Sequence, residues 1–217
     1  MPTVMIIGAS RGIGLELARQ YARDGWRVHA TTRTPEQPGT LGTLAGEVVL
    51  HGLEVRQAGQ IAALAAAVAQ EGIDVLIHNA GVSGRGMRRG EVMAINAEAP
   101  ITVAQALLPA VQRSSEKKLV LITSQLGARY GSRRSLGTYG DSKAALNDAF
   151  RGLAPAWGQA GVIAIVMHPG WVRTDMGGSY ASLSVAESVT GMRQVIARLT
   201  PAAHGRFWTW NGREHPW

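Results

Sequence analysis

The sequence predicts an α/β fold, a doubly wound parallel sheet of about seven strands in a single domain. Three observations lead to this prediction. Short, continuously apolar segments alternate with segments whose apolar residues recur every three or four positions. A glycine-rich turn joins the first apolar segment to the first helical one. No linker, repeat or low-complexity segment divides the 217 residues, a length that suits one large domain.

The first half of the chain alternates apolar strands with two helices. Its strands are short and rich in Val, Ile and Leu, and its helices show apolar residues at three- and four-residue spacing. In chain order, we expect a strand at 4–7, a helix over 13–21 that Asp24-Gly25 ends, strands at 28–32 and 48–50, a helix over 61–68 and a strand at 75–78.

The second half repeats the pattern with longer helices. Ser184 and Glu187 form a capping box at the start of the last helix, and Asn211-Gly212 signals a turn in the tail. In chain order, we expect a helix over 92–111, a strand at 119–123, a helix over 139–157, a strand at 162–167, a helix from Ser184 through Ile196 and a seventh strand in 206–217.

The composition excludes several classes of protein. The chain has no cysteine, which rules out disulfides, a thiol nucleophile and any Cys-ligated metal site. Its 46% apolar and 17% charged residues argue against disorder. The longest mostly apolar stretch, 61–69, is far shorter than the ~20 residues of a membrane span. The N-terminal residues lack the basic region of a signal peptide, so we expect a cytoplasmic protein with no membrane partner.

The basic balance raises the question of nucleic acid binding. The chain has 22 Lys and Arg against 15 Asp and Glu, a net charge of +7. Its two arginine clusters are not interleaved with stacking aromatic residues, so we expect no nucleic acid partner. No pair of histidines and acids has metal-ligand spacing, and we expect no bound metal. The clusters are Arg85, Arg88 and Arg89, which have no assigned role, and Arg129, Arg133 and Arg134.

The glycine turn after the first strand indicates a phosphate-binding site. Gly8, Gly12 and Gly14 allow a tight turn and close approach of the backbone to a pyrophosphate, and the helix behind them offers free N–H groups. Their spacing is G-x3-G-x-G, which differs from the common dinucleotide pattern G-x-G-x-x-G. A glycine-rich strand–helix turn with no ligand is the alternative.

The end of the second strand favours NADP(H) over NAD(H). An NAD-binding unit usually has an acid there that bonds the ribose 2′-hydroxyl, but residues 28–33 contain none. Arg11 and Arg33 could instead form charge-assisted bonds with a 2′-phosphate. Glu36, the nearest acid, lies past the expected strand end. The alternative is that both arginines are ordinary surface residues.

Tyr139 and Lys143 lie four residues apart, on one face of a predicted helix. A phenol normally titrates near pKa ~10, and a neighbouring ammonium favours the phenolate and lowers that pKa. The pair could therefore transfer a proton near neutral pH. By itself the spacing also fits an exposed pair of helix residues.

Together, these motifs resemble the short-chain dehydrogenase/reductase family, and the resemblance covers the whole chain in order. The tail further resembles the small reductases related to the bacterial C-factor and the Sniffer-type carbonyl reductases. The motifs are GASRGIG at 8–14, HNAG at 78–81, Asn96, Ser124, Tyr139 with Lys143, and PGWVRTDM at 169–176.

The resemblance implies a catalytic role for four residues. Tyr139 would protonate the carbonyl oxygen in reduction and act as the base in the reverse direction. Lys143 would bind the nicotinamide ribose and lower the pKa of Tyr139. Ser124 would orient and polarise the substrate carbonyl. Asn96 would hold a water that links the lysine to solvent, although an asparagine can also satisfy the backbone at a helix kink and a serine can cap a helix or turn.

The resemblance also implies that residues 1–217 form one NAD(P)-binding Rossmann domain whose substrate pocket is built from the loops after strands four, five and six. The cofactor would touch the catalytic pair, Tyr139 and Lys143, and three further groups. These are Gly8, Ser10, Arg11, Ile13 and Arg33 for the adenosine and phosphate half, Asn79, Ala80 and Gly81 for the cleft, and Pro169, Gly170, Val172 and Thr174 for the nicotinamide.

Some positions depart from the family pattern. His78 replaces the first asparagine of the family's NNAG, and we expect it to be structural, as we do His168. Glu54 stands where the family often has an aspartate that bonds the adenine, and its role is open. The substrate pocket should involve Gln125, Leu126, Arg129 and Tyr130 after strand five, and Trp171, Met176 and Tyr180 after strand six, although the aromatic residues could equally be core.

The leading hypothesis is an NADPH-dependent oxidoreductase that reduces a small ketone or aldehyde to an alcohol, reversibly. The alternative is a cofactor-binding signalling or regulatory protein of the C-factor type with little turnover. Many relatives pair through the helices near 92–113 and 139–157, so a homodimer or homotetramer is possible and a monomer is left open.

Overall fold

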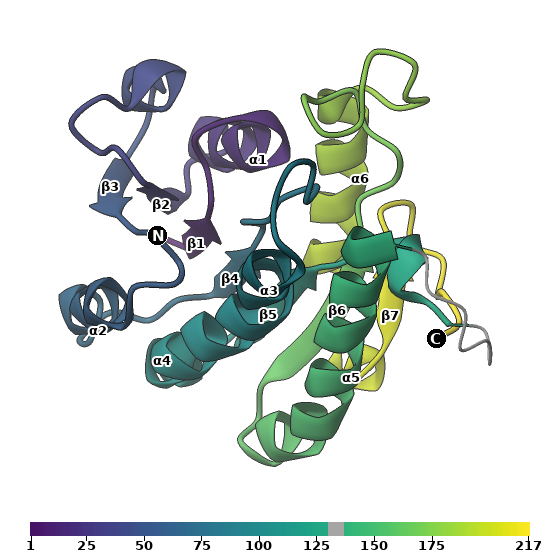
Figure 1. Cartoon of the computed structure of the whole chain (residues 1–217). Coiled ribbons are helices and arrows are strands. Elements are labelled where there is room, and N and C mark those ends of the chain that lie inside the picture. Colours follow the sequence, from purple (N-terminus) through teal and green to yellow (C-terminus); the bar gives the residue numbers. More distant parts are fainter. Residues whose placement is uncertain (130–136) are drawn as a thin grey trace.

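The computed structural model describes residues 1–129 and 137–217. Within them, seven parallel strands form one sheet in the order β3-β2-β1-β4-β5-β6-β7 (Figure 1). The prediction of a doubly wound, Rossmann-type sheet in a single domain is confirmed. The strands are β1 (Thr3–Ile7), β2 (Arg27–Thr32), β3 (Val48–Gly52), β4 (Val75–His78), β5 (Lys118–Ile122), β6 (Ile163–His168) and β7 (Phe207–Thr209).

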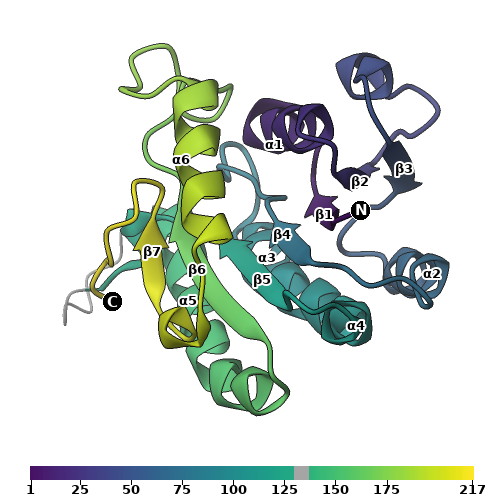
Figure 2. The same cartoon turned by 180° about the vertical axis from the view of Figure 1, so that it is seen from behind.

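Helices cover both faces of the sheet (Figures 1 and 2). One face is covered by α2, α4 and α5, and the other by α1 and α6. Short helical turns complete the connections: η1 (Gly39–Thr43), η2 (Ala94–Glu98), η3 (Gln125–Gly127) and η4 (Pro201–Ala203). The helices are α1 (Gly12–Arg23), α2 (Ala58–Ala67), α3 (Arg89–Met93), α4 (Ala99–Arg113), α5 (Gly137–Gln159) and α6 (Val185–Ala197).

The core consists of two apolar layers separated by the sheet. Successive strand residues alternate between them, so Met5 and Ile7 pack toward α2, α4 and α5, whereas Val4 and Ile6 pack toward α1 and α6. These four side chains are fully buried. Burial of each such side chain contributes about 1.5–3 kcal/mol, which explains why the strands are apolar on both faces.

The helix predicted over 92–111 is interrupted. The helical stretch begins earlier, with α3 at Arg89, and the segment Ala94–Glu98 forms a π-helical turn before α4 continues to Arg113. The apolar spacing predicted one regular helix because the π turn inserts its extra residue without ending the apolar face. Such turns are common at functional sites.

The tail forms a much shorter strand than the segment 206–217 suggested. Only Phe207–Thr209 pair with β6, and the turn at Asn211-Gly212 sends the chain back along the outer edge of β7. Trp208 pairs with Glu214 across this return. The outer edge of β7 is therefore covered by the C-terminal tail of the chain.

The capping box of Ser184 and Glu187 at the start of α6 is confirmed.

The position of the site follows from the strand order. From β1 the chain winds outward through β2 and β3, and then returns to β4 and winds the other way. The loops after β1 and β4 diverge at this switch point and leave a crevice at the carboxyl ends of the strands, where ligands bind in such folds.

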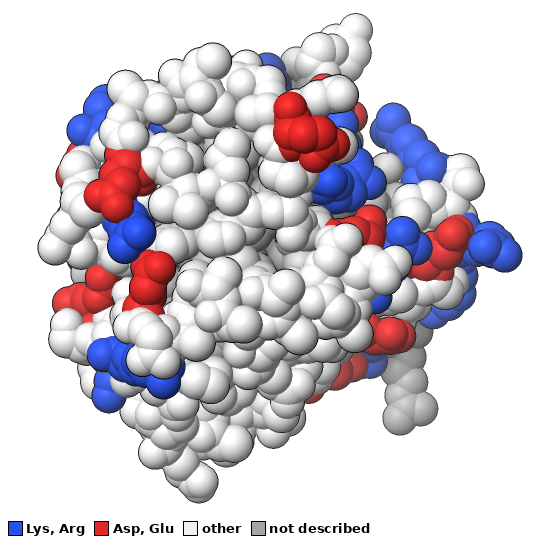
Figure 3. Space-filling model, turned by 90° about the vertical axis from the view of Figure 1, so that its left-hand side faces the viewer, with Lys and Arg blue, Asp and Glu red and all other residues white. Residues whose placement is uncertain are grey.

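Lys and Arg side chains alternate with Asp and Glu on the face drawn in Figure 3, so that face has no large patch of one sign. No helix within the described residues is both long and apolar enough for a transmembrane segment.

Candidate active site

A cleft of about 480 Å³ lies at the carboxyl ends of the strands. It brings together twelve of the residues proposed from the sequence, from the loops after β1, β2, β4 and β6 and from α5. They are Gly8, Ser10, Arg11, Ile13, Arg33, Asn79, Ala80, Gly81, Tyr139, Lys143, Pro169 and Thr174.

The glycine turn is held tightly to its neighbours. The Gly8 N–H donates to Thr31 Oγ1 at 2.8 Å, and the Gly8 carbonyl accepts from Asn79 Nδ2 at 2.8 Å. Gly8 has φ +83°, and a Cβ there would lie 2.8 Å from Ala80. A Cβ on Gly14 would lie only 2.0 Å from the Gly8 carbonyl oxygen. Only glycine fits both positions, because no side-chain atom can be accommodated.

The N-terminus of α1 is suited to an anion. Its N-cap residue, Arg11, makes no side-chain capping bond, and the first turn has no acid, so several backbone N–H groups remain available. Arg11 and Arg33 are both exposed at the cleft. Arg11 forms an ion pair with Asp175 at 3.2 Å, which joins the glycine turn to the loop after β6. These donors and the space left by the glycines fit a dinucleotide.

Tyr139, Ser124 and Lys143 meet near the end of β5. Burial raises the pKa of Tyr139, and a hydrogen bond with Ser124 partly opposes that shift. Lys143 Nζ donates to the carbonyl of Ile122 at 2.9 Å, and burial lowers the pKa of Lys143 to about 8. Burial therefore has the larger effect on the phenol, in the opposite direction to the lowering predicted from Lys143. Ser124 also caps η3 by accepting from the Leu126 N–H at 3.2 Å.

Asn96 lies at the centre of the π turn and is fully buried. Its Oδ1 accepts from the Val82 N–H at 2.9 Å, while its Nδ2 donates to the Val82 carbonyl at 2.8 Å and to Ser142 Oγ at 3.0 Å. Ser142 Oγ in turn donates to the Tyr139 carbonyl at 2.7 Å. Asn96 thus connects the loop after β4 to the helix that holds Tyr139 and Lys143. Its role in holding a water stays a prediction.

Two residues proposed for the nicotinamide lie behind the cleft wall. Gly170 has φ +88°, and a Cβ there would lie 2.3 Å from Leu183 and 2.9 Å from Trp210. Val172 is buried and pairs with Leu183 in an isolated bridge. Neither lines the cleft. They support the loop that places Thr174 and Met176 in it.

The two histidines singled out from the sequence are poor proton carriers at neutral pH. His78 is buried, and desolvation, aided by the charge of Lys143, lowers its pKa to about 3. Burial and the neighbouring His215 lower the pKa of His168 to about 4. Both stay neutral near pH 7, in agreement with the structural roles expected.

The substrate end of the cleft differs from the expectation. Of the described residues proposed there, only Met176 lines the cleft. Trp171 and Tyr180 are exposed rather than core, at 55% and 91%, and Trp171 Nε1 donates to the Gly177 carbonyl at 2.9 Å. Tyr130 lies outside the described residues. The remaining three are exposed as well: Gln125 and Leu126 on η3, and Arg129 just after it.

Sequence reasoning missed several residues of the cleft. Thr31 positions Gly8 but belongs to no motif. Asp175 pairs with Arg11 and lies within the motif at 169–176, which assigned it no role. Gly127 is a third case, because a Cβ there would lie 2.7 Å from the Lys143 backbone carbonyl carbon, so this glycine lets η3 pack on α5. Each depends on contacts distant in sequence. The other lining residues that no prediction placed in the cleft are Thr32, Leu53, Val55, Val82, Ile95, Ile122, Thr123 and Arg173.

Three of the four clustered arginines within the described residues form ion pairs. Arg88 pairs with Glu91 at 3.5 Å, and Arg89 pairs with Asp141 at 2.7 Å, which joins α3 to α5. Glu54, the acid considered for adenine, pairs with Arg56 at 3.1 Å. In the second cluster, Arg129 pairs with Asp148 at 3.0 Å, while Arg133 and Arg134 lie outside the described residues.

Comparison with known proteins identifies the family. Residues 2–183 match the family described as short chain dehydrogenase. The chain belongs to the short-chain dehydrogenase/reductase family. As a member, it is an NAD(P)-dependent oxidoreductase.

Relatives of this dehydrogenase/reductase include the C-signal of Myxococcus xanthus, which is 39% identical over 155 residues, 67% of this chain and 93% of that protein. The carbonyl reductase Sniffer of D. melanogaster superposes with a TM-score of 0.91 at 27% identity, and 100% of each chain is covered. An NADPH-bound carbonyl reductase from chicken fatty liver superposes with a TM-score of 0.89 at 29% identity, covering 100% of this chain and 99% of that one. The resemblance inferred from the motifs is confirmed.

Proposed function

We propose that the protein is an NADPH-dependent reductase that converts a ketone or aldehyde to an alcohol, reversibly. The observation that carries the proposal is the hydrogen bond between Tyr139 and Ser124 beside the buried Lys143. A phenol and a hydroxyl that point to one location can both bond one carbonyl oxygen. The carbonyl reductases among its structural neighbours support the same reaction class.

The chain's own residues hold the cofactor and move the proton. The N–H groups at the start of α1 would bind the pyrophosphate, and Arg11 and Arg33 a 2′-phosphate. When bound, the nicotinamide supplies a hydride to the carbonyl carbon. A phenol is protonated near pH 7, and burial raises the pKa of Tyr139 further, so Tyr139 can give its proton to the carbonyl oxygen while Ser124 orients that oxygen.

Lys143 is buried, with a pKa of about 8, so it is mostly an ammonium at neutral pH. We propose that it binds the nicotinamide ribose and stabilises the phenolate of Tyr139 after proton transfer.

The cleft also contains the apolar side chains of Val82, Ile95 and Met176. They favour a carbonyl compound with an apolar body.

A panel of ketones and aldehydes, followed by NADPH absorbance at 340 nm, tests the proposal. Tyr139→Phe should lower kcat by about 10²–10⁴-fold, the usual contribution of a general acid, and leave NADPH binding within a few-fold of wild type. Tyr21→Phe, a change at a buried tyrosine of α1, is the matched control and should retain kcat. Undiminished turnover by Tyr139→Phe would sink the assigned mechanism.

The similarity to the C-signal supports a second candidate, a cofactor-binding signalling or regulatory protein with little turnover. The same experiment separates the two. Tight NADPH binding with no turnover across the panel would favour the signalling protein, whereas turnover that depends on Tyr139 would favour the reductase.

A further inference from the structure

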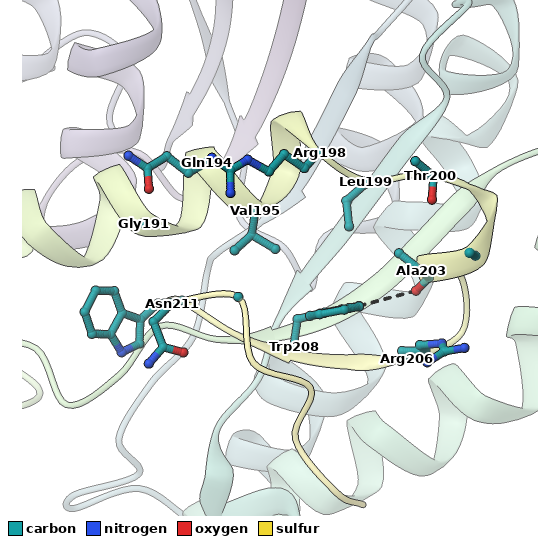
Figure 4. A pocket seen from close by; sticks show the side chains of 13 residues that line it. Gly191, Gln194, Val195, Arg198, Leu199, Thr200, Ala203, Arg206, Trp208 and Asn211 are labelled. Carbon is teal, nitrogen blue, oxygen red and sulfur yellow. Dashed lines mark hydrogen bonds between the residues drawn. The ribbon is translucent and has the colours of Figure 1, made fainter.

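A second cavity, of about 550 Å³, lies between α6 and β7 (Figure 4). Its volume falls within the roughly 300–1,000 Å³ of typical small-molecule sites. It shares no lining residue with the catalytic cleft. The lining residues come from the second half of α6, the connection through η4, β7 and the turn at Asn211-Gly212.

The cavity has the form of a slot with apolar walls. Val195 projects toward the strand from α6, and Leu199 does so from the segment just after this helix (Figure 4). The Trp208 indole lies opposite them, seen edge-on in Figure 4. Trp208 Nε1 donates to the Ala203 carbonyl at 3.4 Å, which restrains the ring. A planar aromatic group inserted between these walls could stack on the indole face and cover the two aliphatic side chains.

The slot is bordered by positive charge. Arg198 and Arg206 both line it, and none of its described lining residues is acidic. Arg206 pairs with Glu214 at 2.7 Å. Arg198, at the C-cap of α6, makes no ion pair or side-chain hydrogen bond with any described residue. An exposed guanidinium without a partner can form charge-assisted bonds with a carboxylate.

We propose that this cavity is a second, non-catalytic binding site for a planar aromatic carboxylate. The ring system lies between Trp208 and the Val195–Leu199 wall, and the carboxylate bonds Arg198. The unpaired cation favours a carboxylate over a neutral apolar molecule. The flat apolar slot favours an aromatic ring over a non-aromatic anion.

The site is separate from the catalytic cleft but shares a wall with its supporting loop. Trp210 packs between Gly191 of α6 and Gly170, since a Cβ on Gly191 would lie 2.6 Å from the ring and one on Gly170 would lie 2.9 Å from it. Pro169, the neighbour of Gly170, lines the catalytic cleft. A test of the second site must therefore locate the ligand as well as detect it.

The six tryptophans allow the ligand to be located, because each indole N–H gives its own resonance. In the full-length protein labelled with ¹⁵N-tryptophan, 2-naphthoate should shift the indole N–H resonances of Trp208 and Trp210 in a saturable manner. The resonance of Trp171, on the loop after β6, should stay in place. Absence of saturable shifts at Trp208 and Trp210, or shifts at Trp171 alone, would overturn the proposal.

Two controls test whether the charge of Arg198 contributes to binding of the carboxylate. Arg198 is exposed, so Arg198→Gln should fold normally and bind 2-naphthoate about tenfold more weakly, the effect expected from loss of one charge-assisted bond. Arg113→Gln, on α4, removes the same charge elsewhere and should bind as wild type does. The neutral analogue 2-naphthalenemethanol should bind wild type and Arg198→Gln equally. Equal affinity of wild type and Arg198→Gln for 2-naphthoate would contradict the carboxylate assignment.

Discussion

The two ends of the catalytic cleft are built in different ways. At the glycine turn, the backbone of Gly8 is bonded on both sides, and Gly14 has no room for a single added carbon. At the opposite end, Met176 lines the cleft from the loop after β6 and is 41% exposed, while Tyr180, on the same loop outside the cleft, is 91% exposed. The first end is determined by backbone contacts that permit one residue type, and the second by side chains that can vary.

This difference explains which part of a ligand each end of the cleft can recognise. A turn packed to the limit of van der Waals contact holds backbone N–H groups in one place, which suits an invariant pyrophosphate. A loop with exposed apolar side chains can accept different shapes with little effect on the fold. The cofactor end should therefore respond strongly to small substitutions, and the substrate end weakly.

The largest effect is expected at Gly14. In Gly14→Ala, the new Cβ would lie 2.0 Å from the Gly8 carbonyl oxygen, so the turn must move. We expect NADPH affinity to fall by about 100-fold or more and the free energy of unfolding to fall by about 1–3 kcal/mol. Calorimetric titration and urea denaturation measure the two quantities.

Gly59→Ala is the matched control, because a Cβ at that exposed position of α2 would meet nothing within 4 Å. It should raise the free energy of unfolding by about 0.5–1 kcal/mol and leave NADPH affinity unchanged. If Gly14→Ala and Gly59→Ala change NADPH affinity and the free energy of unfolding alike, tight packing of the glycine turn is not what makes the cofactor end sensitive to substitution.

An intermediate effect is expected at Arg33. Arg33→Gln removes a guanidinium from the cleft without disturbing the core, since the side chain is exposed. The KM for NADPH should rise about 10- to 100-fold, the effect of losing a hydrogen bond between charged groups, while the KM for NADH stays nearly constant. Steady-state kinetics with both cofactors provide the internal control. A parallel rise in both KM values would contradict recognition of a 2′-phosphate.

The smallest effect is expected at the substrate end. Met176→Ala should raise the KM for an apolar aromatic aldehyde about five-fold, because roughly 1 kcal/mol of hydrophobic contact is lost. Tyr180→Ala, on the same loop but outside the cleft, should have no effect. A larger loss for Tyr180→Ala than for Met176→Ala would place the substrate outside the cleft described above.

The cofactor end was predictable to a large extent. Gly8 and Gly14 impose constraints that one residue type satisfies, so the constraint appears directly in the sequence. Tyr139 and Lys143 were predictable because one turn of helix brings them to the same face. The substrate end was not, since Trp171 and Tyr180 turned out to be exposed and only Met176 reaches the cleft. An aromatic residue in a loop has no periodicity from which burial can be inferred.

The sequence by itself determined the parallel sheet and the nucleotide-binding turn, because apolar periodicity and glycine spacing are local properties of the chain. Its motifs, taken in order along the chain, carried the resemblance to the family. Only the tertiary structure decided how the proposed catalytic groups are held. The π turn at Asn96 bonds Val82 and Ser142, which are 14 and 46 residues away in the chain. It likewise decided that a second cavity lies between α6 and β7. Contacts between distant segments depend on the packing of the whole domain, and no local pattern encodes them.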